Sequence, residues 1–577
     1  MTAITHFFGD AYDAEISAGE RPELRVRVRG RELLALRVAS AVDAGGKLDV
    51  AGALDAPEVR EPAAGLELVW RGRTALWDEI VLRAHFDRDA IRFGYTIRGR
   101  GDIDRAHFGA DAKGRSRAVH QVLWSPEPTG DQTIRFALGE RALISVSSDK
   151  TFHLGHWFFT PPPFAFALGS GDEDAWLVAG VLSRAEDSNF TAFEVGPGDG
   201  LSLSLRYDGH ERVDGTWHSP DLVLLPAPDP YPGLSAYCEL LRRESFAPLL
   251  PSVVSRPGWW SEPMFCGWGE QCVVADANAT QTLTARATDY ATETQYETFV
   301  SRLEAHGIAP GTIVIDDKWQ RAYGTNEPDP EKWPHLSRFI AAQHRRGRRV
   351  LLWLKAWDPE GLDAATECIL ADDGTPLSAD PTAPPYAARL RSSVRRMLVE
   401  LGADGFKLDF THLIPTGRGG RSRDGLWGLA LMRAYLSLLH DAMRSVRADA
   451  LLIAHNANPA FADVVDMLRL NDVPQVLGQP KSYVAAMEHR ARIARAASPL
   501  WLLDTDNWPS PDRASFREYL EHQARLGVPS LYYASRIRWR TDDEPWVDEE
   551  LREEDFAALR HAWAEYRSRL TPIAAVT

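Results

Sequence analysis

Residues Gly402–Pro415 read Gly-Ala-Asp-Gly-Phe-Lys-Leu-Asp-Phe-Thr-His-Leu-Ile-Pro. The segment Gly405–Phe410 is apolar enough to form a buried strand, yet it contains two charged residues, Lys407 and Asp409. Because side chains alternate between the two faces of a strand, both charges lie on one face. Charged groups are rarely buried without a partner or a purpose. The stretch therefore predicts either a structural ion pair or a catalytic carboxylate, and we favour the second for Asp409.

Outward from this strand, apolar and amphipathic segments alternate between residues 258 and 540. The apolar segments predict eight strands, at Met264–Trp268, Thr312–Asp317, Arg349–Trp357, Gly405–Phe410, Leu451–His455, Met467–Asn471, Leu500–Asp504 and Ser530–Ala534. The amphipathic segments predict helices, at Glu293–His306, Leu336–Arg346, Tyr386–Leu401, Leu426–Val446, Ser482–Ala496 and Arg513–Leu526. Eight β/α alternations over about 280 residues have the order and size of a (β/α)8 TIM barrel. A doubly wound open sheet is the rival fold, but the sequence lacks the Gly-rich phosphate-binding turn that such a sheet normally carries.

The N-terminal region, residues 1–233, has a different pattern. Short β-rich segments recur between Gly, Asp and Pro clusters, at Leu24–Val28, Leu66–Trp70, Ile80–Phe86, Ala90–Ile97, Trp176–Leu182 and Leu201–Tyr207. This pattern predicts an antiparallel β-sandwich. Residues 234–257 predict a linker helix, and residues 541–577 predict a charged loop and a final helix. The expected fold class is thus α/β, with a TIM barrel preceded by the sandwich. The aromatic and Pro-rich segment Phe152–Phe164 is either core packing beside a turn or a loop that caps the barrel.

Composition and net charge disfavour several classes of function. The formal net charge of -16 disfavours nucleic acid and anionic membranes as partners. No apolar run approaches the roughly 18 residues of a membrane span, and the N-terminus does not resemble a signal peptide, so a cytoplasmic location is expected. The four cysteines are too few and too scattered for a disulfide framework or a zinc site. We therefore expect no cofactor and no metal, and an oligomer remains open.

Functional groups of TIM barrels lie at the C-terminal ends of the strands. The residues expected there are Trp268, Asp316, Asp317, Trp319, Trp353, Lys355, Lys407, Asp409, Asp472, Asp504, Asp506 and Trp508. Carboxylates that alternate with Trp and Lys at successive strand ends predict a polar pocket with aromatic walls, as a carbohydrate site requires. Trp353 fits barrel filling as well as stacking on a sugar, because barrel interiors need bulky side chains.

Hydrolysis of a glycosidic bond needs two carboxyl groups that flank the anomeric carbon. Asp409 is the expected nucleophile, since Lys407 on the same strand face favours its ionised form. Asp472, after the sixth strand, is the expected acid/base. Asp504 and Asp506 compete with it, although we interpret them as residues that hold sugar hydroxyls. A metal-dependent barrel hydrolase is disfavoured, because the first strand leads to Trp268-Gly-Glu rather than to His-x-His.

These residues carry a family resemblance. Ile315–Gln320 resembles the second-strand signature of α-galactosidases and raffinose-synthase-like proteins, although Lys318 stands where a Gly usually follows the Asp pair. Asp329–Pro334 is similar to the segment before the third strand, and Asp404–Phe410 looks like the nucleophile strand, of the retaining α-glycosidases of glycoside hydrolase families 31 and 36. The resemblance implies Asp409 as nucleophile, an acid/base near Asp472, and an N-terminal β-sandwich.

The expected function is therefore that of a retaining exo-α-glycosidase acting on a carbohydrate, with α-galactosides favoured. An α-glucosidase, an α-xylosidase or a transglycosylase would use the same two carboxylates. A catalytically silent sugar-binding protein is a further alternative, which loss of either carboxylate would favour.

Overall fold

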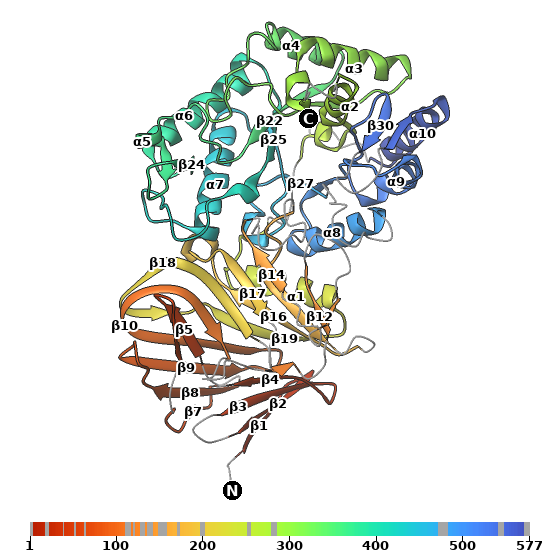
Figure 1. The fold of residues 1–577 in the computed structure, drawn as a ribbon. Coiled ribbons are helices and arrows are strands. Elements are labelled where there is room, and N and C mark those ends of the chain that lie inside the picture. The colour runs from red at the N-terminus through yellow and green to blue at the C-terminus, as the bar shows by residue number, and fades with distance from the viewer. Residues whose placement is uncertain are drawn as a thin grey trace, which may run out of the picture.

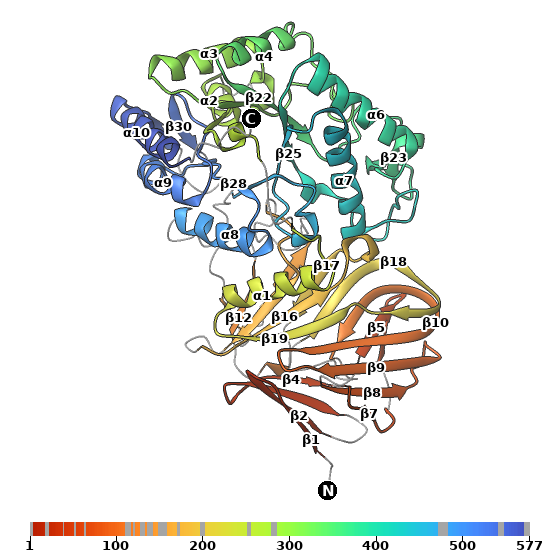
Figure 2. The same ribbon diagram turned by 180° about the vertical axis from the view of Figure 1, so that it is seen from behind.

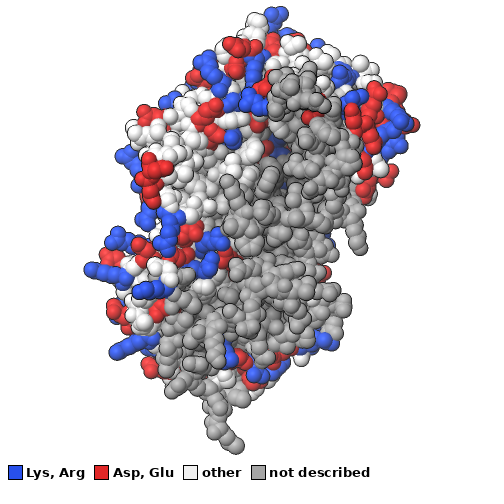
Figure 3. Space-filling view, viewed as in Figure 1, with Lys and Arg blue, Asp and Glu red and all other residues white. Residues whose placement is uncertain are grey.

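The computed structural model describes residues 4–17, 22–37, 40–50, 54–62, 65–109, 117–118, 122–126, 133–135, 142–147, 159–169, 174–196, 202–250, 256–278, 286–470, 483–539 and 547–570. Two parts are visible, a β-rich N-terminal part and an α/β part that contains the barrel (Figure 1). On the described surface, acidic and basic side chains are interspersed, including at the waist between the two parts (Figure 3). Within the described residues, no helix combines the length and the apolarity that crossing a membrane would require.

The N-terminal part consists of two antiparallel sheets. One has the order β1 (Ile4–Phe8), β2 (Tyr12–Ser17), β3 (Glu23–Val28), β4 (Arg31–Arg37), β11 (Arg117–Ala118). The other contains β5 (Ser40–Ala44), β6 (Lys47–Val50), β7 (Glu58–Arg60), β8 (Leu66–Gly72), β9 (Glu79–Phe86), β10 (Ile91–Phe108), β12 (Val122–Trp124), β13 (Thr133–Arg135), β14 (Ala142–Ser145), β15 (Ala165–Gly169), β16 (Trp176–Leu182), β17 (Ala192–Gly196), β18 (Ser202–His218) and β19 (Asp221–Ala227). Burial alternates residue by residue along β2, β3 and β9, so one face of each sheet packs into the core.

A large bulge interrupts the pairing of the two longest strands, β10 and β18. Ile103 pairs with Glu211 and Arg105 pairs with Arg206, so Asp104 alone lies opposite the four residues Tyr207–His210. Bulges bend a strand and redirect its side chains. We call residues Tyr207–His210 the β18 bulge. Its residues Asp208, Gly209 and His210 form hydrogen bonds with the barrel.

The connection between the two parts is helix α1 (Pro230–Arg243), which lies between strand β16 and the barrel helix α8 (Tyr483–Ala497), as Figure 2 shows. It begins and ends earlier than predicted. The side chain of Asp229 accepts a hydrogen bond from the Tyr231 backbone N–H and caps the helix. The helix ends at Arg243, and Ser245 beyond it adopts a left-handed φ of 62°, so the helix stops well before residue 257.

The barrel contains eight parallel strands, which confirms the predicted fold class. They are β20 (Met264–Cys266), β21 (Thr312–Ile315), β22 (Arg349–Lys355), β25 (Gly405–Asp409), β26 (Leu451–Ala454), β27 (Met467–Arg469), β28 (Leu502–Asp504) and β29 (Ser530–Leu531). Each lies inside a segment predicted as strand. The sheet order runs from β28 through β25 and β20 to β29, and a bridge between Asp504 and Val528 brings its two ends together.

Helices surround the barrel. They are α2 (Trp268–Asn278), α3 (Glu293–Ala305), α4 (Leu336–Arg345), α5 (Ala364–Glu367), α6 (Pro384–Arg395) with the π-helical turn η5 (Arg396–Glu400), α7 (Gly428–Val446), α8, α9 (Arg513–Leu526) and α10 (Glu553–Arg569). Two small hairpins add β23 (Cys368–Leu370) to β24 (Pro376–Ala379), and β30 (Arg536–Trp539) to β31 (Val547–Glu550). Helix α2 and strand β31 were not predicted, because neither segment has a clear hydrophobic period.

Candidate active site

Strand β25 lies at the centre of the candidate site. A side chain at Gly405 would come within 2.1 Å of the Leu451 carbonyl oxygen, so glycine lets β25 approach β26 closely. All five residues of the strand are buried, including Lys407 and Asp409. The strand ends at Asp409, and the next residue, Phe410, has a left-handed φ of 59°. Non-glycine residues seldom adopt this conformation, and they cluster at functional sites.

The carboxylate of Asp409 is held by neighbouring strands. Its Oδ2 accepts hydrogen bonds from the indole N–H of Trp353 and from the Arg469 guanidinium, both at 3.1 Å. Its Oδ1 accepts the Phe410 backbone N–H at 2.9 Å. The Nε2 atom of His455 lies 3.7 Å from the same oxygen. Asp409 is 6% exposed, so the carboxylate is buried at the C-terminal end of the barrel.

The environment favours the ionised form of Asp409. Burial raises the pKa of this carboxyl, but the charges of Arg469 and Lys407 oppose burial and outweigh it. The net result is a pKa well below the usual range of an aspartate. Burial also lowers the pKa of His455 to about 3, so its ring is neutral at physiological pH. The site thus presents one stable carboxylate, as a nucleophile requires.

Lys407 makes its ion pair with Asp316, not with Asp409. Its Nζ atom lies 2.6 Å from Asp316 Oδ2, and the thiol of Cys266 donates to the same oxygen at 2.9 Å. Both charged side chains are 3% exposed. A structural ion pair between Lys407 and Asp409, the alternative that the sequence left open, is therefore wrong. Lys407 acts on Asp409 through its charge alone.

Asp317 follows Asp316 and has a different character. It is 9% exposed, and its Oδ1 accepts a hydrogen bond from the Tyr323 hydroxyl at 2.8 Å. Burial raises the pKa of Asp317 to about 7, the hydrogen bond from Tyr323 opposes this, and the charges of Asp316 and Asp409 add to it. Near neutral pH this carboxyl is therefore protonated in a large fraction of molecules, and it can donate as well as accept a hydrogen bond.

The residue after this pair is Lys318, with a left-handed φ of 76°. This conformation explains why glycine is usual at that position in the α-galactosidase signature. The Lys318 ammonium pairs with Glu360 and lies 3.6 Å from the centre of the Tyr323 ring. Lys355, at the end of β22, lies 4.5 Å from the same ring and 2.7 Å from Asp358. Two lysines thus approach the tyrosine that binds Asp317.

The tryptophans divide into two groups. Trp268 and Trp508 are partly exposed, and their rings meet edge to face with their centroids 6.5 Å apart. Their role as a pocket wall stays a prediction. Trp353 is buried and binds Asp409. Trp319 has no exposed surface, and its indole N–H donates to the Trp353 carbonyl oxygen at 2.8 Å. Its burial corrects the prediction that Trp319 offers a stacking surface, and assigns it to packing.

Asp504 and Asp506 differ although both are buried. Asp506 Oδ2 accepts two hydrogen bonds from Arg469, at 2.9 and 2.7 Å. Asp504 accepts hydrogen bonds from the Ser530 hydroxyl and the Asp506 backbone N–H. Burial, followed by the charge of Asp506, raises the pKa of Asp504 to about 6. Arg469 thus bridges Asp409 and Asp506, a role that we did not predict. The signal was available, because Arg469 is a charged residue at the end of a buried strand, as Lys407 is.

Asp472, the predicted acid/base, lies outside the described residues, and so does the first part of the Phe152–Phe164 segment. The remainder of that segment contacts the barrel of its own chain. The side-chain amide of Asn456 donates to the Thr160 carbonyl oxygen, and that of Asn458 donates to the Pro162 carbonyl oxygen, both at 2.8 Å. Both asparagines directly follow strand β26, so the sandwich reaches the C-terminal face of the barrel.

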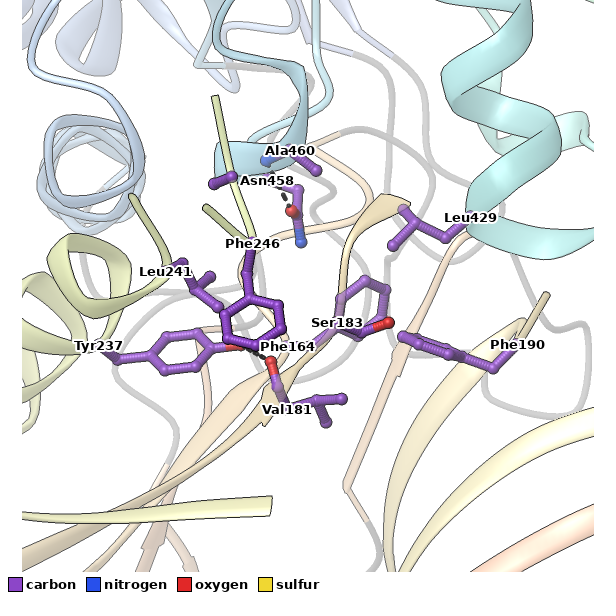
Figure 4. Close-up of a pocket in the computed structure, with 11 residues that line it drawn as sticks. Phe164, Val181, Ser183, Phe190, Tyr237, Leu241, Phe246, Leu429, Asn458 and Ala460 are labelled. Atoms are coloured by element: carbon purple, nitrogen blue, oxygen red, sulfur yellow. Dashed lines mark hydrogen bonds between the residues drawn. The ribbon is translucent and has the colours of Figure 1, made fainter. Parts of the chain in front are cut away.

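A small cavity lies at this junction (Figure 4). It is mostly apolar and has a volume of about 10 Å³, enough for about one water molecule. Its lining residues are Phe164, Val181, Ser183, Phe190, Tyr237, Leu241, Phe246, Ala247, Leu429, Asn458 and Ala460. The cavity is a packing defect between sandwich, linker and barrel, and it is too small for a sugar. In the part of the chain that the structure describes, no cluster of three or more His, Cys, Asp or Glu side chains could hold a metal ion.

Comparison with known proteins shows the fold. No family model matches the chain, and no curated protein matches it in sequence. A family 31 sulfoquinovosidase from E. rectale superimposes with a TM-score of 0.57 at 12% identity, over 96% of this chain and 82% of that one. A family 31 α-xylosidase from a soil metagenome superimposes with a TM-score of 0.52 at 10% identity, over 98% of this chain and 83% of that one. The galactosidase domain of an α-galactosidase-sucrose kinase superimposes with a TM-score of 0.50 at 12% identity, over 98% of this chain and 86% of that one. The chain therefore shares the sandwich-plus-barrel fold of these enzymes.

Proposed function

We propose that the protein is a retaining exo-α-glycosidase that acts by double displacement through a covalent glycosyl-enzyme on Asp409. The observation that carries this proposal is the Asp409 carboxylate. It is buried at the end of the fourth barrel strand, held by three donors, and kept ionised by Arg469 and Lys407. Glycoside hydrolases share this fold, and the fold neighbours named above include an α-xylosidase and a galactosidase domain.

The mechanism follows from the two oxygens of Asp409. Oδ2 receives two side-chain hydrogen bonds, whereas Oδ1 receives only the Phe410 backbone N–H. We infer that the less stabilised Oδ1 attacks the anomeric carbon as the glycosidic bond breaks. A second carboxylic acid protonates the leaving oxygen and then deprotonates the water that releases the sugar. Asp472 remains our proposal for this acid/base, because Asp506 is committed to Arg469.

Binding of the sugar falls to the second and third strand ends. Asp317 has a pKa raised to about 7, so its protonated form is available near neutral pH to donate a hydrogen bond to a sugar oxygen, and Lys355 lies on the Tyr323 ring beside it. The partly exposed Trp268 and Trp508 offer a stacking surface. Asp316 and Lys407 neutralise each other beneath the site. Within this class we favour α-galactosides, on the Asp-Asp-Lys-Trp sequence after β21.

A panel of aryl α-glycosides tests the proposal, with galactose, glucose and xylose as the sugar and the first-formed anomer followed by NMR. We expect the α-galactoside to react fastest and the α-anomer to form first. Formation of the β-anomer would exclude double displacement, and no turnover of any α-glycoside would remove the proposed function. Addition of an acceptor sugar separates hydrolysis from transglycosylation by the product. A structure that describes Asp472 should place its carboxyl about 5–6 Å from that of Asp409.

A further inference from the structure

The β18 bulge contacts one segment of the barrel, the loop Thr411–Trp427. This loop begins two residues after Asp409 and ends where helix α7 starts. The bulge and the loop are joined by hydrogen bonds of His210 and Asp208 with Gly417 and of Gly209 with Arg421. A bulge with three extra residues is not needed to continue the sheet, so its contacts indicate its purpose.

His210, the last residue of the β18 bulge, makes the central contacts. Its Nε2–H donates to the Gly417 carbonyl oxygen at 2.7 Å. Its ring stacks on the ring of Trp427, with the centroids 3.8 Å apart and the planes 23° apart. The Gly417 backbone N–H in turn donates to Asp208 Oδ2 at 3.3 Å. Both backbone polar groups of Gly417 are thus bound by the sandwich, and so is the last residue of the loop.

Two arginines of the loop reach back to the sandwich. Arg421 donates to the Gly209 carbonyl oxygen at 3.2 Å, and Arg418 pairs with Asp104, the residue opposite the bulge. Basic and acidic side chains mix on this side of the waist in Figure 3. Arg418 and Arg421 are exposed, but each already binds a group of the sandwich. Their position therefore gives no reason to propose an anion site.

The end of the loop is also fixed by the sandwich. The Trp427 backbone N–H donates to Asn189 Oδ1 at 3.1 Å, and the Leu429 backbone N–H donates to the Phe190 carbonyl oxygen at 3.1 Å. Gly428, between them, has a φ of +51°, and a side chain there would come within 2.1 Å of the Phe190 carbonyl oxygen. The first turn of α7 therefore rests directly on the sandwich.

The start of the loop belongs to the candidate active site. The Thr411 carbonyl oxygen accepts the indole N–H of Trp357 at 2.9 Å. The Thr411 hydroxyl accepts a hydrogen bond from the Asn456 amide at 2.9 Å. Phe410, between Asp409 and Thr411, has the left-handed backbone that directs its N–H to the carboxylate. A shift of the loop would therefore be transmitted to Asp409 through two residues.

We propose that the β18 bulge clamps the loop Thr411–Trp427 and thereby positions Asp409 for attack, with His210 as the key positioning residue. The inference rests on the proposed function. The sandwich then has a role in the chemistry, although none of these residues touches the substrate. Displacement of a reacting group by about 1 Å can cost about 10²-fold in rate, so a clamp on this loop has a measurable effect.

The test compares His210→Ala with His218→Ala, an exposed histidine on the same strand that lies away from the barrel. Hydrogen exchange of the whole chain and steady-state kinetics on the best aryl α-glycoside are the two readouts. In His210→Ala we expect exchange of residues 411–427 to rise about tenfold or more. We expect kcat to fall by about 10- to 100-fold, with KM changed less than about threefold. His210→Gln, which restores an N–H donor, should recover part of kcat, and His218→Ala should match the wild type.

The outcomes separate the clamp from the function. Unchanged exchange of residues 411–427 in His210→Ala overturns the clamp, whatever the kinetics. Raised exchange with unchanged kcat overturns the positioning of Asp409. A wild-type chain that hydrolyses no α-glycoside removes the proposed function, and with it the positioning role, while exchange still decides the clamp. If His210→Ala fails to fold, the exposed Arg421→Ala removes the contact to Gly209 with little risk to folding. It should then raise exchange of the same loop and lower kcat by a smaller factor.

Discussion

Strand β25 has a buried aspartate at each end, and the two serve different purposes. Asp404 precedes the first residue of the strand, at the N-terminal face of the barrel, and Asp409 ends it at the C-terminal face. Neither side chain is more than 9% exposed. Asp404 accepts three hydrogen bonds and forms an ion pair with Arg447, so each oxygen has two partners at distances of 2.7–3.1 Å. The three hydrogen-bond donors belong to His344, Arg349 and Val350, and the fourth partner is the Arg447 guanidinium.

The two carboxylates differ in how many polar partners surround them, not in how deeply they are buried. An ionised carboxylate has about four lone-pair positions, and Asp404 has a partner within 3.1 Å for each of them. Asp409 accepts three hydrogen bonds and retains one position on Oδ1, towards His455. A saturated carboxylate can only hold the structure together, whereas a nucleophile needs a free lone pair. The number of close polar partners therefore distinguishes Asp404 from Asp409, the proposed nucleophile, where burial does not.

The largest expected effect is that of Asp409→Ala. Loss of the nucleophile should lower kcat on the best aryl α-glycoside by about 10⁴-fold or more. Added azide should restore turnover and give a β-glycosyl azide, because azide can attack where the carboxylate is missing. Initial rates and NMR of the product check this. Asp441→Ala, at an exposed position on α7, is the control and should behave as wild type. Unchanged activity of Asp409→Ala would end the assignment.

Asp404→Asn should reduce stability and leave the activity of the folded protein unchanged, the opposite of Asp409→Ala. It leaves Arg349 and Arg447 without their buried partner, which should lower the free energy of unfolding by about 3–5 kcal/mol. The folded fraction should keep its kcat. Urea unfolding and rates corrected for folded protein check both statements. Asp449→Asn removes a more exposed partner of Arg447 and should cost less than about 1 kcal/mol. A catalytic defect in folded Asp404→Asn would break the comparison.

The effect of Asp317→Asn on the free energy of unfolding should depend on pH. The pKa of Asp317 is raised by folding, so its contribution to stability is full at acid pH and is lost as the pH rises to about 7. Asparagine does not ionise, so the variant should gain stability relative to the wild type between pH 4 and pH 8, by up to about 4 kcal/mol. Urea unfolding across this range checks the sign. Tyr323→Phe removes the hydrogen bond that lowers this pKa, so in that variant the loss of stability should continue to a higher pH than in the wild type. A difference that is constant with pH would contradict the raised pKa.

Arg469→Gln should change the pH profile of the folded enzyme. The substitution removes the charge that most lowers the pKa of Asp409, so this pKa should rise. Protonated Asp409 cannot attack, and the acid limb of the kcat/KM profile should therefore move to higher pH. Arg469→Lys keeps the charge without the planar fork and should show a smaller displacement. An acid limb that stays in place would show that Arg469 does not control Asp409.

Much of the fold could be predicted, because the barrel strands are short apolar segments between amphipathic helices. All eight observed strands lie within predicted segments. Period and polarity also place Asp409 and Asp317 at strand ends. They do not reveal pairing between strands, and so the partner of Lys407 was assigned by proximity in sequence. Parallel strands β21 and β25 are not adjacent, and the contact of Lys407 with Asp316 crosses the barrel interior.

Other features depend on side chains from distant segments. Arg469 has its role only because Asp409 and Asp506 come from other strands. The burial of Trp319 results from its contact with the backbone of β22, which no local pattern encodes. The β18 bulge is defined by a pairing mismatch with β10, and sequence periodicity within β18 cannot show it. Local patterns thus predict elements and strand ends, whereas electrostatics of the site require the assembled barrel.

The β18 bulge has a consequence for evolution and engineering of this architecture. Sandwich and barrel occupy separate stretches of sequence, which suggests modules that recombination could exchange. The contacts of the bulge with Gly417 and Trp427 join residues more than 200 positions apart in the chain. A foreign sandwich grafted onto this barrel would have to bring a matching bulge, or the loop would have to be replaced with it. If the bulge positions Asp409 as proposed, the bulge and the loop must be exchanged together. Chimaeras that keep the domain boundary but separate the bulge from its loop should fold poorly and have low activity.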